Sequence, residues 1–184
     1  MYYVYFLKSS VNGDLYVVKG TSVYKIPADG SQVPPPLIST NLEAPYGIAL
    51  DTQGNIYVSD LGSSHQIKKF DPTGRLLQTL GAPGGRPWQA VGPFGNRLHF
   101  PIGVAVDTQG RVVVTEDSPP RRVVRLDPNG QMGTEWTGPQ YYSGTIGVDE
   151  DDPLYVYFTH GEGASTALTR FRVNDLYFYL AVAT

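Results

Sequence analysis

Residues 45–60 read PYGIALDTQGNIYVSD, and residues 101–116 read PIGVAVDTQGRVVVTE. Both stretches place the tetrapeptide Asp-Thr-Gln-Gly at the same point, at 51–54 in the first and at 107–110 in the second. Self-similarity at a period of tens of residues indicates a repeat architecture, in which each unit is one supersecondary structure that cannot bury its apolar faces alone.

The similarity continues beyond these two stretches. HQIKKFDPTGRLL at 65–77 matches RRVVRLDPNGQMG at 121–133 in the same register. Weaker copies of the strand, turn and strand order lie at 12–33, 145–159 and 168–180. The repeat therefore extends over nearly the whole chain of 184 residues.

Each repeat has the pattern of four short strands. The first is apolar and nearly continuous (47–50 and 103–106), as expected of a strand buried on both faces, whereas the second and third alternate and the fourth is more polar. Rising polarity from first to last strand is what a blade of a β-propeller requires, and no window has a useful helical period. We predict an all-β propeller with four four-stranded antiparallel blades at about 2–39, 45–81, 101–137 and 144–182, and a Gly- and Pro-rich insertion at 82–98.

The acidic residues of the repeat lie at its turns. Asp51 and Asp107 begin Asp-x-x-Gly hairpins, and Asp71 and Asp127 begin Asp-Pro-x-Gly turns. In such turns the carboxylate accepts local backbone N–H groups and Gly takes a positive φ. We interpret all four as turn formers and not as catalytic carboxylates.

Composition excludes several classes of protein. The hydrophobic fraction of 41% is enough for a packed core, and the net charge of −3 offers no electrostatic footprint for nucleic acid. There is no cysteine, so disulfides and thiolate metal sites are excluded. The first apolar run, 2–7, is far too short to insert into a membrane and lacks the flanks of a signal peptide.

The core Pro-x-Gly-[Ile/Val]-Ala-[Leu/Val]-Asp-x-x-Gly, followed by a Val/Ile strand and Asp-Pro-x-Gly, resembles the NHL repeat in residues 45–81 and 101–137. The resemblance implies a propeller, usually of six blades, that serves as a platform for proteins, RNA or ligands and rarely as an enzyme. GAPGGRPW (81–88) and the segment 137–153 are similar to propeller segments of large secreted bacterial proteins, which implies an extracellular or periplasmic location.

The nearest enzymes of this type are the peptidyl-hydroxyglycine amidating lyases. Their His-Gln and His-Phe pairs are similar to His65-Gln66 and His99-Phe100 here. In those lyases the catalytic zinc is held by His residues that follow Pro at the head of the innermost strand, and the matching positions here are Tyr46 and Ile102. Since neither side chain ligates zinc as imidazole does, the resemblance does not extend to the lyase chemistry.

Two weak candidates for metal binding remain. His65, His99 and His160 could converge on a zinc ion from three blades, although three unrelated loop histidines are the simpler interpretation. Asp149 and Asp151 belong to a run of four acids that could bind Ca²⁺, but the run coincides with a hairpin position and is better interpreted as a solvated acidic turn. We expect no cofactor.

The insertion is the better candidate for function. It holds Arg86, Trp88, Phe94 and Arg97 among Gly and Pro, and Tyr46 heads a neighbouring inner strand. Trp and Arg are enriched at binding hot spots, and propeller loops carry function on a rigid scaffold. The alternative is a loop that folds its own aromatics over a blade edge. We expect a non-catalytic module that binds a protein or glycan, with a metal-dependent lyase or lactonase as the alternative.

Four repeats are fewer than the usual six, and the last one ends on an outermost strand, so no terminal strand is left to latch a ring. Open blade faces and unpaired strand edges favour association. The expectation is therefore that the chain is part of a longer propeller or associates with a second copy, and that it is not a stable free monomer.

Overall fold

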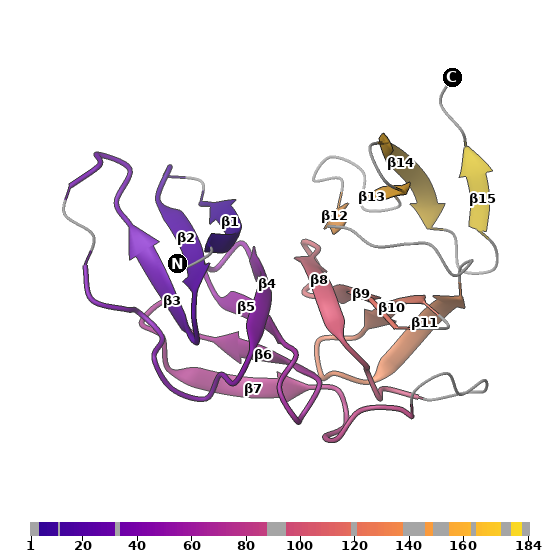
Figure 1. Cartoon of the computed structure of the whole chain (residues 1–184), viewed down its shortest axis with the longest axis horizontal. Helices are drawn as coiled ribbons and strands as arrows, with labels where there is room; N and C mark the ends of the chain where they lie inside the picture. Colours follow the sequence, from indigo (N-terminus) through magenta and orange to yellow (C-terminus); the bar gives the residue numbers. More distant parts are fainter. Residues whose placement is uncertain are drawn as a thin grey trace.

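The computed structural model describes residues 4–10, 12–31, 34–87, 95–118, 121–137, 146–148, 155–162, 165–173 and 178–181. All regular structure in these ranges is β-strand, and they include no helix that could cross a membrane. The strands form four antiparallel sheets, each with its strands in consecutive order. In Figure 1 the sheets stand around a common centre, with β1 (Val4–Ser9), β4 (Pro45–Leu50), β8 (Pro101–Val106) and β12 (Ile146–Val148) nearest to it.

The predicted blade order is confirmed in the last three sheets. The second sheet continues from β4 through β5 (Ile56–Asp60), β6 (Gln66–Phe70) and β7 (Leu76–Leu80). The third continues from β8 through β9 (Val112–Glu116), β10 (Arg122–Leu126) and β11 (Met132–Thr137). The fourth continues from β12 through β13 (Tyr155–Glu162), β14 (Ser165–Val173) and β15 (Phe178–Ala181).

The first sheet differs from the expectation of four strands. In the part of this blade that the structure describes it has three, namely β1, β2 (Leu15–Lys19) and β3 (Ser22–Ile26), followed by a bridge between Val23 and Ile38. The segment that would form a fourth strand contains Pro34, Pro35 and Pro36. Proline has no backbone N–H to donate, so a run of three cannot continue a ladder.

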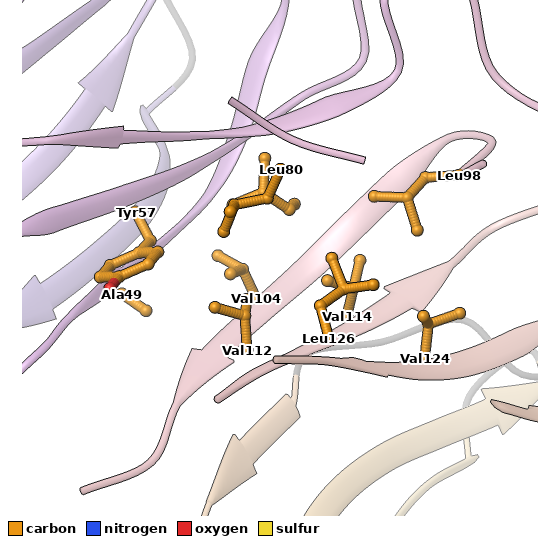
Figure 2. Packing of buried hydrophobic residues seen from close by; sticks show 10 residues of the cluster. Ala49, Tyr57, Leu80, Leu98, Val104, Val112, Val114, Val124 and Leu126 are labelled. Atoms are coloured by element: carbon orange, nitrogen blue, oxygen red, sulfur yellow. The ribbon is translucent and has the colours of Figure 1, made fainter. Parts of the chain in front are cut away.

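The inner strands are apolar on both faces because each contributes to two cores. Ile48 of β4 and Ile56 and Val58 of β5 pack with the first sheet, whereas Ala49 and Tyr57, one residue along, pack with the third. Side chains of a strand alternate between its faces, so a period of two divides one strand between two seams. Figure 2 shows the core between the second and third sheets. Truncating one of these buried aliphatic residues to Ala would cost about 2–5 kcal/mol.

The turn interpretation of the acidic repeat residues is confirmed. Asp51 Oδ1 accepts hydrogen bonds from the backbone N–H groups of Gln53 and Asn55, at 3.0 and 2.8 Å. Asp71, Asp107 and Asp127 accept equivalent pairs in their own turns. In all four turns the glycine has a positive φ, as at Gly54 with 79°.

A side-chain hydroxyl group stabilises the irregular start of the inner strands β4 and β8. The register of β4 shifts between Pro45 and Ile48, and the Gly47 N–H there donates to Ser59 Oγ at 2.7 Å. Ser59 Oγ also donates to the Ile102 carbonyl at 3.2 Å, which joins the second sheet to the third. An added Cβ at Gly47 would lie 2.4 Å from that carbonyl oxygen, so only glycine allows the two inner strands to approach this closely.

Candidate binding site at the seam of the second and third sheets

A buried carboxylate at the end of β9 organises this part of the molecule. The Glu116 carboxylate accepts four hydrogen bonds. The donors are Arg86 Nε at 2.8 Å, Arg122 Nη2 at 2.7 Å, Arg122 Nε at 3.0 Å and the His99 backbone N–H at 3.0 Å. The three charged side chains are each at most 3% exposed. Arg122 also pairs with Glu135, so two cations meet two anions and the charges balance. Buried ions are tolerated when paired and hydrogen-bonded in this way.

The same contacts hold the base of the insertion. The Ala82 N–H donates to the Asn96 carbonyl at 3.0 Å, and the Arg86 N–H donates to the Leu98 carbonyl, also at 3.0 Å. Arg122 Nη2 donates to the Arg97 carbonyl at 2.6 Å. Both arms of the connection between β7 and β8 are therefore bound to each other and to the third sheet.

Three rings cluster where these arms meet the second sheet. His65 precedes β6, whereas His99 and Phe100 precede β8. The ring centroids of His65 and His99 are 4.6 Å apart, and the Phe100 centroid lies 5.2 Å from His65 and 4.8 Å from His99. His99 Nδ1 lies 2.6 Å from Oγ of the buried Ser118, which also receives Arg86 Nη2 at 3.3 Å.

Two residues of this cluster adopt a backbone conformation that non-glycine residues rarely take. His65 has φ of 49° and Phe100 has φ of 46°. The Phe100 N–H donates to His65 Nδ1 at 3.3 Å, so one strained residue is bonded to the other. Gly85 lies close against His65: an added Cβ there would lie 2.8 Å from His65 Cδ2 and 2.7 Å from the Leu98 carbonyl oxygen.

Their partly buried surroundings favour the neutral form of both imidazoles. Burial lowers the pKa of His65 below 6.5, although Glu116 and Asp60 oppose the shift. Burial likewise lowers the pKa of His99, and the neighbouring His65 and Arg86 add to this effect. Because Nδ1 of neutral His65 accepts a hydrogen bond, its proton is assigned to Nε2.

The residues predicted for binding differ in how far they are exposed to solvent. Arg86 is buried and its guanidinium contacts Glu116 and Ser118. Arg97 is exposed in the insertion, and Tyr46 is half-buried at the second position of β4. Trp88 and Phe94 lie outside the described residues. A binding role for these residues stays a prediction.

The predicted metal ligands are only partly brought together. His65 and His99 are adjacent, while His160 lies in β13, where only the backbone is described. Asp149 and Asp151 lie outside the described residues. No group of three His, Asp or Glu side chains within the described ranges is placed to hold a metal ion.

Sequence reasoning missed Glu116, Ser118 and the strain at Phe100. Glu116 occupies the position of Asp60 in the preceding repeat, so the recurrence of an acid after the second strand was a usable signal. Nothing local marks Ser118 or Phe100, because their partners lie 19 and 35 residues away.

Consecutive antiparallel sheets around a centre, with hydroxyl- and carboxylate-stabilised connections, define a β-propeller architecture. Within this propeller, residues 44–70 match the NHL repeat family.

Among curated relatives, a peptidylglycine alpha-amidating monooxygenase from Rattus norvegicus is 33% identical over 97 residues, which cover 50% of this chain and 9% of that protein. A probable peptidyl-alpha-hydroxyglycine alpha-amidating lyase from Caenorhabditis elegans is 30% identical over 91 residues, which cover 48% of this chain and 24% of that protein. The chain thus spans a quarter or less of the length of these relatives.

Among solved structures, a gluconolactonase from Xanthomonas campestris superposes with a TM-score of 0.57 at 23% identity, over 84% of this chain and 53% of that chain. This likeness concerns the fold.

Proposed function

We propose that this chain is a non-catalytic binding module, which engages a protein or glycan through the loops at the end of the blades where β4 and β8 begin. The observation that carries the proposal is the Arg86–Glu116 ion pair, which ties the base of the 82–98 insertion to the third sheet. Anchoring preorganises the base of the loop, so less conformational entropy is lost there when a partner binds.

The ionised groups beside this surface support binding over catalysis. Glu116 and Arg122 are saturated by each other and by their neighbours, and Asp60 is fully buried against Lys68 and backbone N–H groups. A general acid or base must reach the proton that it transfers, and these groups face the fold interior.

The zinc of the amidating lyases does not fit the residues at the heads of the inner strands. Pro45 and Pro101 begin β4 and β8, so Tyr46 and Ile102 take the positions that follow. Ile102 is 8% exposed and presents only hydrocarbon. A hydrocarbon side chain cannot replace an imidazole ligand, and we assign no step to zinc at these positions.

The test combines assays of activity and of binding. The purified chain is given a peptidyl-α-hydroxyglycine and gluconolactone, with and without added zinc or calcium, and turnover at the buffer rate is expected. Labelled chain is then applied to peptide and glycan arrays. Arg97→Ala in the insertion should weaken the retained spots, whereas Arg75→Ala in the turn before β7, also exposed, should not. Turnover above background with either substrate would contradict the proposal.

A metal-dependent propeller enzyme is the second candidate. It is favoured by the names of the relatives and by the contact between His65 and His99. Metal analysis of purified chain separates the two candidates, because stoichiometric zinc or calcium that His65→Ala removes would favour the enzyme. Substoichiometric metal that is unaffected by His65→Ala would favour the binding module.

A further inference from the structure

Phe100 is an exposed aromatic ring in a rigid setting. Among the described residues, the large apolar side chains that are exposed are Leu77 at 45% and Phe100 at 39%. Leu77 lies on the outer strand β7, whereas Phe100 immediately precedes β8, one of the strands nearest the centre in Figure 1. Aromatic residues, Phe included, are enriched at the cores of protein–protein interfaces.

The conformation of Phe100 is held from several sides. Its positive φ is unfavourable for a residue with a side chain, and so is that of His65, to which its N–H donates. Strain of this kind persists only where the surroundings impose it, and it concentrates at functional sites. Since the Phe100 ring stays partly in solvent, core packing alone does not account for it.

We propose that the Phe100 ring and the Nε2–H of His65 form a recognition site for an extended peptide segment. An apolar side chain of the peptide packs on the ring, and a neighbouring backbone carbonyl accepts the hydrogen bond from His65. This inference rests on the proposed binding function and names the class of partner and the residues that contact it.

The polar groups around the rings favour a peptide over a glycan. Glu116 already accepts four hydrogen bonds, and the Ser118 hydroxyl is buried between His99 and Arg86. A sugar carries several adjacent hydroxyls that need both donors and acceptors, and these neighbouring acceptors are engaged by the fold. An apolar side chain beside one carbonyl needs only a ring and one N–H.

The test uses N-acetyl-L-leucinamide as a minimal peptide and methyl glucopyranoside as a minimal sugar. Each is titrated into the isotope-labelled chain while the ring proton resonances of His65 and Phe100 are followed by NMR. We expect saturable shifts with the amide, at a dissociation constant of about a millimolar, and none with the sugar. Phe100→Ala and His65→Ala should each weaken binding about tenfold or more, and Leu77→Ala should leave it unchanged.

A structural variant separates recognition from folding. Phe100→Gly relieves the positive φ that Phe100→Ala retains, so its urea midpoint should exceed that of Phe100→Ala while amide binding is lost in both variants. Absence of saturable shifts, equal response to the sugar, or unchanged binding by Phe100→Ala would each overturn this inference. If those results came with buffer-rate turnover and insertion-dependent array binding, the site would be wrong and the proposed function would stand.

Discussion

Asp60 and Glu116 occupy the same position in successive repeats, and each binds the segment that leads into the inner strand beside it. Asp60 Oδ1 accepts the Ala44 N–H at 2.7 Å, and Glu116 Oε1 accepts the His99 N–H at 3.0 Å. Each acid also pairs with a cation of the third strand, Lys68 at 2.6 Å for Asp60 and Arg122 at 2.7 Å for Glu116. The repeat thus contains a carboxylate that fastens its entering loop, in addition to the acids of its turns.

Removing the charge of Glu116 should destabilise the fold strongly. Glu116→Gln leaves the buried Arg86 and Arg122 without their shared anion, and breaking a buried pair in this way costs about 3–5 kcal/mol. Glu135 is the other partner of Arg122, and the Glu135 side chain is 32% exposed. Glu135→Gln should therefore cost at most about 1 kcal/mol. Urea unfolding measures both variants, and equal losses would contradict the assignment.

The lowered pKa of Asp60 should make the folded chain less stable in acid. Burial pushes the pKa of Asp60 up, but hydrogen bonds from Lys68 and from the Ala44 and Glu43 amides outweigh burial and hold it below 3.8. The unfolded chain therefore binds this proton at higher pH than the folded one. The contribution is fully present above the unfolded pKa, about 3.9, and is lost as the pH falls through the folded pKa. Urea midpoints between pH 2 and 6 should show a shallower decline in Asp60→Asn, and parallel curves would exclude the effect.

Gly84 and Gly85 form a matched pair for the loop that covers His65. Both have positive φ, of 80° and 66°, so alanine at either position costs about 1–2 kcal/mol in backbone strain. A Cβ at Gly84 meets nothing within 4 Å, whereas one at Gly85 would collide with the Leu98 carbonyl and the His65 ring. Gly85→Ala should therefore cost at least about 1 kcal/mol more and shift the His65 ring resonances. Equal losses in urea unfolding would contradict this account.

The hydroxyl of Ser59 should be required, while its exact side chain should not. Ser59→Ala leaves the buried Gly47 N–H without an acceptor, which costs about 1–3 kcal/mol. Thr115 performs the same role in the next repeat, accepting the Gly103 N–H at 3.1 Å, so Ser59→Thr should lose less stability than Ser59→Ala. Thermal and urea unfolding of both variants provide the measurement, and an alanine variant as stable as the original would count against the role.

Local sequence patterns were enough to predict the blades, because strands and hairpin turns depend on residues that are close together in the sequence. The alternation in β5 and the paired Asp and Gly of each turn act within a few residues, so spacing alone identified strands and hairpins. The first sheet was the exception: Pro34 to Pro36 remove the donors of the expected fourth strand. That local signal was present in the sequence and was outweighed by the repeat pattern.

The contacts of the candidate site could not be predicted from local patterns, because they join residues far apart in the sequence. The presence of Arg86 in the insertion was evident, but whether its guanidinium faced solvent or Glu116, 30 residues later, depended on how two sheets pack. The contact of His65 with His99 also joins separate blades. Such contacts result from the packing of whole blades against each other, which no short window of sequence encodes.

By itself, the sequence determined the repeat, its strand order and its turns, because hydrophobic period and turn chemistry act over a few residues. Only the tertiary structure decided that Arg86 serves as a buried anchor, that Glu116 unites two arginines, and that Phe100 is held in a strained conformation beside His65. These properties arise from desolvation and close approach between distant segments, and both depend on where the folded chain excludes water.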